Sequence, residues 1–114
     1  MNFENIQRLP LTTLPTALSA MPNLSRELGE INLYIKRDDV MEIAHGGNKT
    51  RKLEYVFADA LAKGADCVIT MGGIQSNHVR QTVSVAAKLG LESHVVLTNP
   101  VPEMETELLS SVII

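Results

Sequence analysis

The sequence predicts an α/β fold built around a parallel β-sheet. Two helical patterns, over residues 48–63 and 76–89, are each followed by a glycine and then by a short apolar strand. This alternation is typical of parallel sheets, in which a helix connects each strand to the next over short loops. Both strands are built around continuous apolar runs instead of strict alternation, which favours a sheet that is covered on both faces.

The N-terminal part of the chain is predicted to be mostly irregular, because Pro10, Pro15 and Pro22 interrupt it. A short helical turn is expected within "TALSAM" or "LSREL". Residues 31–36, "INLYIK", then alternate apolar and polar side chains and include β-branched and aromatic members. This pattern predicts a half-buried strand. The following "RDDV" is expected to be a solvated exit turn whose two aspartates have no catalytic role.

The first long helix is expected to begin at Asn48, a plausible N-cap, and to stop at Gly64. Its apolar side chains recur at helical spacing, which predicts one buried face. The members of that face are Leu53, Val56, Phe57, Ala60 and Leu61.

A strand over residues 67–71, "CVITM", follows the first helix, and the turn "GGIQSNHVRQ" leads into a second helix over residues 76–89. Gly90 is its expected stop, and "SHVVLT", residues 93–98, is the next strand. The buried face of the second helix is predicted to contain Val79, Val83, Ala86 and Leu89.

The composition fits one small domain. The chain has 114 residues, of which 45% are hydrophobic, and a formal net charge of −3. This charge argues against a nucleic-acid or membrane partner bound through bulk charge. No apolar run approaches the roughly 20 residues of a membrane span, and no secretory signal is recognisable. A single Cys67, expected to be a small buried side chain, excludes a disulfide within one chain and fits a reducing cytoplasm.

Three cations, Lys49, Arg51 and Lys52, occupy the predicted first turn of the helix at residues 48–63. The N-terminal end of a helix carries a partial positive charge, so basic residues are disfavoured there. Like charges favour the neutral amine at Lys49, the form that condenses with a carbonyl to give a Schiff base. Gly46 and Gly47 would allow a bulky planar ligand to approach it. A solvated basic turn whose side chains point apart is the alternative.

A second candidate site is the turn "GGIQSNHVRQ" between a strand and a helix. Ligands of open α/β sheets bind at the carboxyl ends of the strands. Free helix N–H groups and the side chains of Ser76, Asn77 and His78 would form a site for a carboxylate or a phosphate. The alternative is that Ser76 or Asn77 only caps the helix.

The histidines predict no metal site. His45, His78 and His94 are not spaced like metal ligands, and no cysteine or paired carboxylate completes a set. From these residues alone, a flavodoxin-like ligand-binding module with an inert Lys49 stays open as an alternative.

The stretches "GGNKTRKLE" and "GGIQSNHVRQ", at this separation, resemble those of fold type II pyridoxal-phosphate enzymes, in the branch of D-cysteine desulfhydrase and 1-aminocyclopropane-1-carboxylate deaminase. "PLTTLPTALSAMPNLSRELG", "LYIKRDDV" and "GADCVITM" also look like that branch, so the resemblance extends over about residues 10–102. It implies the tryptophan synthase β-like fold, of which this chain would be the N-terminal portion. Residues 1–45 would belong to the large cofactor domain, and residues 46–114 to an incomplete small α/β domain.

The resemblance also implies roles for residues of both motifs. Lys49 would bind pyridoxal 5'-phosphate covalently and, once displaced by the substrate, act as general base, with Ser76 as a candidate catalytic partner. Asn48 and Asn77 would contact the cofactor, Asn77 at its phenolic oxygen. Ser76, Asn77 and His78 would hold the substrate carboxylate.

The histidine of "QSNH" resembles the D-cysteine desulfhydrase side of the branch, whereas the deaminase more often has glutamine there. This implies α,β-elimination from D-cysteine or a similar small amino acid, which gives hydrogen sulfide, ammonia and pyruvate. The deaminase reaction is one alternative, and a non-catalytic truncated product is another. Family members are several times longer and carry their phosphate-binding loop later in the chain, so we expect this chain alone to be weak or inactive. A homodimer is expected of full-length relatives.

Overall fold

The computed structural model describes residues 5–29 and 31–99. These residues form two separate two-stranded sheets, β1 with β2 antiparallel and β3 with β4 parallel. The predicted α/β fold with a parallel sheet is therefore confirmed. In chain order the elements are β1 (Leu18–Ala20), α1 (Pro22–Glu27), β2 (Tyr34–Lys36), the 3-10 helix η1 (Asp38–Val40), α2 (Lys49–Ala62), β3 (Cys67–Gly73), α3 (Asn77–Leu89) and β4 (Glu92–Thr98).

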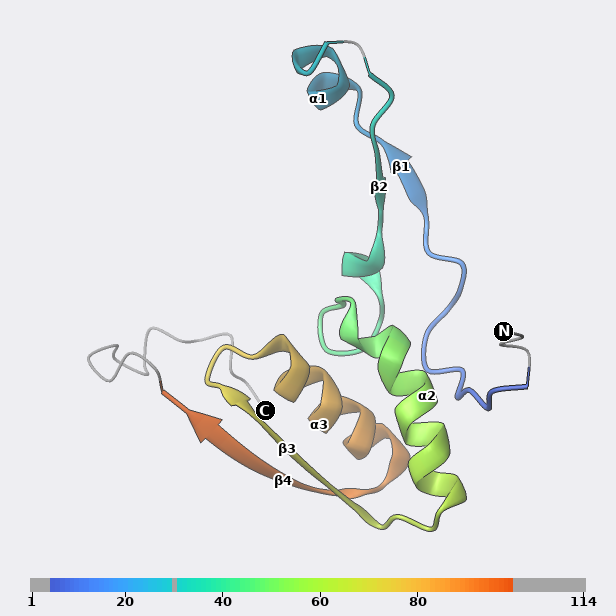
Figure 1. Cartoon of the computed structure of the whole chain (residues 1–114), viewed down its shortest axis with the longest axis vertical. Coiled ribbons are helices and arrows are strands. Elements are labelled where there is room, and N and C mark those ends of the chain that lie inside the picture. The colour runs from blue at the N-terminus through green and yellow to red at the C-terminus, as the bar shows by residue number, and fades with distance from the viewer. Residues whose placement is uncertain (1–4, 30, 100–114) are drawn as a thin grey trace.

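Helix α3 connects the two parallel strands and lies between their sheet and α2 (Figure 1). The register runs from Cys67 opposite Glu92 to Gly73 opposite Thr98. Side chains of both helices and of the segment before α2 form the buried core, and the N-terminal residues therefore share one core with the helices. The assignment of residues 1–45 and 46–114 to two domains stays a prediction. The core residues are Leu11, Ile43, Leu53, Phe57, Val85 and Ala86.

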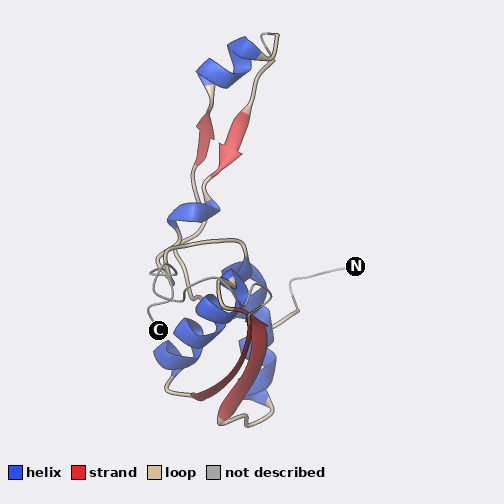
Figure 2. Ribbon diagram, turned by 90° about the vertical axis from the view of Figure 1, so that its left-hand side faces the viewer, coloured by secondary structure: helices blue, strands red, loops and turns tan. Residues whose placement is uncertain are grey.

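An arm projects away from this core (Figures 1 and 2). It consists of β1, α1, β2 and their connections, residues 17–29 and 31–37. The predicted short helical turn is confirmed by α1, which lies in the second of the two segments named, "LSREL". The first segment, "TALSAM", contains β1 and pairs with β2. The half-buried strand predicted at residues 31–36 is shorter and exposed, because the described residues place no second layer against the arm.

The predicted apolar face of α2 is partly wrong. Phe57 is buried as expected, but Val56 is 57% exposed. Glu54 is buried in its place, with 1% of its surface exposed. Its carboxylate accepts hydrogen bonds from Arg8 Nε at 2.7 Å and from the Leu11 N–H at 3.2 Å. A carboxylate can be buried when it is paired and hydrogen-bonded. Glu54 is therefore on the buried face of α2 because it binds the N-terminal segment.

Helix α3 begins and ends where the sequence predicts. Ser76 is the N-cap and accepts a hydrogen bond from the Val79 N–H, and Gly90 ends the helix with a φ of 72°. Left-handed backbone at this position is the usual stop of a helix and suits glycine. Within the helix, the core position expected for Val83 is taken by Val85, while Val83 is only half-buried.

The described residues cover one face of the β3–β4 sheet. Val68 packs against the core and Thr70 is buried, whereas Ile69 is 76% exposed and Met71 66% exposed on the opposite face. Val96, opposite Met71 in the register, is exposed as well. The prediction of a sheet covered on both faces is therefore met on the α3 side only.

Candidate active site

The segment that leads into α2, residues 44–49, is called the lysine loop below. Its first four residues all have positive φ, namely Ala44 (50°), His45 (60°), Gly46 (72°) and Gly47 (121°). A left-handed backbone costs about 1–2 kcal/mol at residues other than glycine. Ala44 and His45 therefore hold strain immediately before Lys49, and strain of this kind concentrates at functional sites.

Two close approaches explain the glycines of the lysine loop. A Cβ on Gly46 would lie 2.0 Å from the Asp39 carbonyl oxygen, and one on Gly47 would lie 2.6 Å from Gln81 Nε2. The Gly47 N–H donates to the Asp38 carbonyl at 2.8 Å. The glycine pair is thus needed to fold the loop, a structural reason that the sequence did not reveal.

Lys49 is the first residue of α2, and its side chain is partly exposed. Its amine has no hydrogen bond or ion pair to any residue that the structure describes. Asn48 occupies the N-cap position, but its φ and ψ of −68° and −13° are helical and its side chain makes no cap hydrogen bond. The expected capping role of Asn48 is therefore wrong.

The positive charge of Arg51 near Lys49 is paired with the negative charge of Asp38. Its guanidinium donates two hydrogen bonds to the carboxylate of Asp38, from Nε to Oδ2 at 2.5 Å and from Nη2 to Oδ1 at 2.7 Å. Thr16 Oγ1 also donates to Asp38, at 2.7 Å. These hydrogen bonds, from Arg51 first and then Thr16, hold the pKa of Asp38 well below its usual range. Asp38 is an anchor of the lysine loop and not part of a solvated exit turn, as its sequence context suggested.

The three polar residues of the second motif lie at the N-terminal turn of α3. Ser76 is half-buried and caps the helix through its 3.3 Å bond from the Val79 N–H. A Cβ on Gly72 would lie 2.8 Å from Ser76 Oγ, so a larger residue at that position would have to displace the Ser76 side chain. Asn77 is exposed. Ser76 therefore caps the helix through its oxygen, and the hydrogen of its hydroxyl is still available as a donor.

His78 relates the two motifs to each other. Its Nε2 lies 3.4 Å from Thr70 Oγ1, and its Nδ1 lies 3.4 Å from Thr82 Oγ1. Burial, followed by the charges of Lys52 and Lys49, lowers the pKa of His78. The imidazole is therefore mainly neutral near pH 7 and lies within electrostatic reach of both lysines of α2. The structure thus brings Lys49 and His78 into one neighbourhood, although 29 positions separate them in the sequence.

A direct connection between the motifs was missed by sequence reasoning. Gln81 Oε1 accepts from the backbone N–H of Thr50 at 2.9 Å and from its hydroxyl at 2.8 Å. Arg80 Nη1 donates to the carbonyl of Ala44 in the strained part of the loop. The one available signal was Gln81 itself, a long amide among apolar residues on the buried side of a helix.

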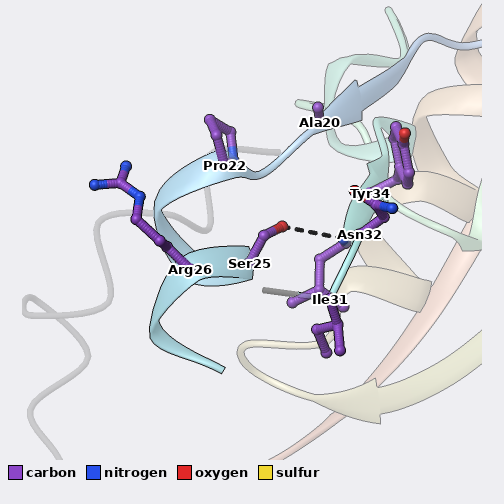
Figure 3. A pocket seen from close by; sticks show the side chains of 8 residues that line it. Ala20, Pro22, Ser25, Arg26, Ile31, Asn32 and Tyr34 are labelled. Carbon is purple, nitrogen blue, oxygen red and sulfur yellow. Dashed lines mark hydrogen bonds between the residues drawn. The ribbon is translucent and has the colours of Figure 1, made fainter. Parts of the chain in front are cut away.

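A pocket of about 250 Å³ lies at the tip of the arm (Figure 3). Ser25 closes one side, where its hydroxyl accepts from the Leu33 N–H at 3.1 Å. The tip is at the far end of the arm from α2, the helix that begins at Lys49 (Figure 1). The pocket therefore has no part in the candidate active site. Its lining comprises Ala20, Pro22, Ser25, Arg26, Ile31, Asn32, Leu33 and Tyr34.

The other reactive side chains in the described part of the chain do not form a second centre. His94 pairs with Glu92 at 3.3 Å on the exposed sheet face. Cys67 is half-buried in β3, and burial, followed by the charge of Asp66, raises the pKa of its thiol, which disfavours a nucleophilic thiolate. Across residues 5–29 and 31–99, no group of three or more His, Cys, Asp or Glu could hold a metal ion. In the same residues, no helix has the length and apolar character of a membrane span.

Comparison with known proteins places this geometry in a family. The chain is 62% identical over 100 residues to D-cysteine desulfhydrase of Salmonella paratyphi C, and 61% identical to that of Salmonella newport. Each alignment covers 88% of this chain and 30% of the relative. The chain therefore spans about a third of the length of the curated relatives that it matches.

A solved structure titled "Crystal Structure Analysis of the ACC deaminase homologue" superposes with a TM-score of 0.82 at 44% identity. The superposition covers 96% of this chain and 34% of that one. The family model described as "Pyridoxal-phosphate dependent enzyme" matches residues 9–112, which is most of the chain. The chain belongs to the pyridoxal-phosphate-dependent enzyme family.

Proposed function

We propose that Lys49 binds pyridoxal phosphate covalently, and that the full-length protein uses it for α,β-elimination from D-cysteine. The identity of 62% to a D-cysteine desulfhydrase across nearly the whole chain supports the reaction. The observation that supports the site is the pair of hydrogen bonds from Thr50, next to Lys49, to Gln81, which holds the start of α2 against the helix that carries Ser76 and His78. The products would be hydrogen sulfide, ammonia and pyruvate.

The residues present fit this cofactor. Lys49 offers a partly exposed amine that has no competing partner in the described structure, which an aldehyde requires. The glycine pair before it adds no side chain beside the amine. Asn48 and Asn77 are both exposed and supply amide groups at the two helix ends that would face the ring. When bound, the cofactor accepts the electron pair released as a Cα–H bond breaks, and the protein supplies orientation and charge.

The N-terminal turn of α3 would hold the substrate carboxylate. The backbone N–H groups of Asn77 and His78 have no intrahelical acceptor, as in the first turn of any α-helix, and the helix dipole favours an anion there. Ser76 can add its hydroxyl hydrogen, because its oxygen is the part used for the cap. His78 would contribute its backbone N–H to this site, and its ring, whose pKa is lowered, would stay neutral beside the carboxylate.

Lys49 would also move the proton. Once substrate has taken its place on the cofactor, its amine is free to accept the Cα proton of D-cysteine. Ser76 is the proposed partner of this transfer from the opposite helix. Sulfide then leaves from Cβ, and hydrolysis of the remaining three-carbon unit gives pyruvate and ammonia.

The deaminase activity is a second candidate, favoured by the superposition on the ACC deaminase homologue. The two reactions use substrates that differ in shape, because 1-aminocyclopropane-1-carboxylate has a ring and no thiol. Assays of the full-length protein with each compound separate them. Sulfide and pyruvate from D-cysteine support our proposal, whereas ammonia released only from the cyclopropane amino acid contradicts it.

The covalent site can be tested on this chain. Pyridoxal phosphate is added, the mixture is reduced with borohydride, and the modified lysine is identified by peptide mapping. We expect attachment at Lys49 in preference to Lys52 and Lys63, and loss of that attachment in a Lys49→Ala variant. Equal labelling of all lysines would contradict the proposal and favour the alternative of a ligand-binding module in which Lys49 is inert.

We further propose that this chain alone turns over D-cysteine weakly or not at all, and that the full-length protein is a cytoplasmic homodimer. The chain spans about a third of its relatives, so most of their length lies outside the residues compared. Turnover by the 114-residue chain at the rate of the full-length protein would refute the first point. Light scattering of the full-length protein tests the second.

A further inference from the structure

Gln81 is a polar side chain in a position where packing alone would favour an apolar one. It lies in α3 with none of its surface exposed, among the largest buried side chains of the described structure. Its oxygen accepts two hydrogen bonds from Thr50, at 2.9 Å and 2.8 Å. Its amide nitrogen is the one buried side-chain polar atom in the described residues that has no hydrogen-bond partner.

This half-satisfied amide is costly. A buried donor without an acceptor costs about 1–3 kcal/mol, and an apolar side chain of similar length would avoid that cost. The nitrogen is held against the lysine loop, since a Cβ on Gly47 would lie 2.6 Å from it. Gln81 thus touches the chain on both sides of Lys49, at Gly47 before it and at Thr50 after it.

The hydrogen bonds of Gln81 replace a missing cap. The first N–H groups of a helix need acceptors, which an N-cap side chain usually provides. Asn48 provides none to α2. Gln81 provides it from the neighbouring helix, and it takes up the Thr50 hydroxyl as well.

We propose that Gln81 is a positioning residue for Lys49, which fixes the start of α2 against α3. This inference rests on the proposed function of Lys49. Ser76 and His78 stand at the start of the same helix α3, so Gln81 sets the distance between the lysine and the proposed carboxylate site. Arg80, next to it, supports the same loop through the Ala44 carbonyl. A rigid helix that carries both parts holds them more accurately than a loop would.

The test compares Gln81→Met, which removes the acceptor, with Gln81→Glu, which keeps an acceptor oxygen for Thr50. Ser84→Ala is the matched control, because it removes a polar contact to the Arg80 carbonyl within α3 and leaves Thr50 untouched. Two quantities are measured in the 114-residue chain. One is the hydrogen exchange rate of the Thr50 amide, with β3 amides as reference. The other is the ratio of borohydride-fixed pyridoxal phosphate on Lys49 to that on Lys52.

In Gln81→Met we expect Thr50 to exchange about tenfold faster, and the Lys49 to Lys52 ratio to fall by a similar factor, as loss of about 1.4 kcal/mol at the start of α2 would give. The β3 amides should keep their rates. Ser84→Ala should behave like the unmodified chain. Gln81→Glu should keep the slow Thr50 exchange relative to the β3 amides, because a carboxyl oxygen still accepts from Thr50, although burial of the carboxyl group lowers the free energy of unfolding of the whole domain. Unchanged Thr50 exchange in Gln81→Met, or an equal loss in Gln81→Glu, overturns the proposal.

If Gln81→Met does not fold, Thr50→Val carries the test. It removes the hydroxyl donor and keeps the backbone donor, so a smaller change in the same direction is expected, and no change refutes the proposal. The two hypotheses fail separately. Lack of preference for Lys49 in the unmodified chain refutes the proposed function, while the exchange rate of Thr50 still decides the role of Gln81.

Discussion

Replacement of Gly46 by alanine should distort the lysine loop and lower the free energy of unfolding by an amount that can be estimated from the geometry. Gly46 has a φ of 72°, and an added Cβ would lie 2.0 Å from the Asp39 carbonyl oxygen and 2.5 Å from its carbon. Real Cβ atoms essentially never approach another atom within 3.0 Å, and the atoms met here belong to the backbone. The loop must therefore move as a whole, because no flexible side chain can give way.

Three contributions set the magnitude. The left-handed conformation costs alanine about 1–2 kcal/mol. Forcing a methyl group into a filled space adds about 1–3 kcal/mol. The lower entropy of the unfolded alanine chain returns about 0.4–1 kcal/mol. Gly46→Ala should therefore lower the free energy of unfolding by about 1–5 kcal/mol, a sizeable share of the 5–15 kcal/mol typical of a domain.

Gly64→Ala is the matched control, because Gly64 has a φ of 77° and nothing within 4 Å of its added Cβ. It carries the conformational cost without the clash, about 1 kcal/mol in net terms. Urea unfolding followed by circular dichroism measures both variants. The argument is refuted if Gly46→Ala is no more destabilised than Gly64→Ala, since the close approach to Asp39 would then not constrain the loop.

Three further perturbations test other contacts. Glu54→Ala removes the buried acceptor of Arg8 and of a backbone N–H, and should lower the free energy of unfolding in urea by about 2–4 kcal/mol. Asp38→Asn should make thermal stability less sensitive to acid. The pKa of Asp38 is lowered on folding, so its stabilising effect is present above about pH 4 and is lost as the pH falls through the folded pKa. Lys52→Met should raise the pKa of His78 in an NMR titration, because the cation contributes to lowering it, after burial.

Each of these has a control within the chain. Asp59→Ala removes an exposed carboxylate from the same helix as Glu54 and should barely move the urea midpoint. An Asp38→Asn variant that loses as much stability in acid as the unmodified chain would show that the Arg51 pair does not matter. Lys63→Met, at the far end of α2, should leave His78 unchanged. An identical titration of His78 in both lysine variants would mean that Lys52 is not its neighbour.

The parts of the fold that follow from the sequence are those fixed by neighbouring residues. Ser76 caps α3 and Gly90 ends it as predicted, because both signals act within one helical turn. The two apolar strands that flank α3 are predicted for the same reason. They carry continuous apolar side chains bounded by glycines and turns.

The buried face of α2 could not be predicted in this way. Glu54 and Thr50 are buried because Arg8 and Gln81 satisfy them, and those partners lie 46 and 31 positions away. Periodicity alone therefore favoured Val56, which is exposed. Within the candidate site, the motifs identified Lys49, Ser76, Asn77 and His78, whose roles are still predictions. Gln81, which connects the two motifs, ends the stretch "GGIQSNHVRQ", but nothing in the sequence shows that it contacts Thr50, 31 positions away.

The core described above predicts an order for the steps of folding. The β3, α3 and β4 unit closes contacts between elements that are adjacent in the chain, which is fast because short loops lose little entropy. The N-terminal segment must instead close long loops, such as the bond from Lys88 Nζ to the Leu11 carbonyl across 77 positions. The contacts of Glu54 and of the core around Ile43 can form only after that segment has docked. The lysine loop lies between the N-terminal segment and the unit of β3, α3 and β4. We therefore expect the site around Lys49 to form last, after both of these parts have folded.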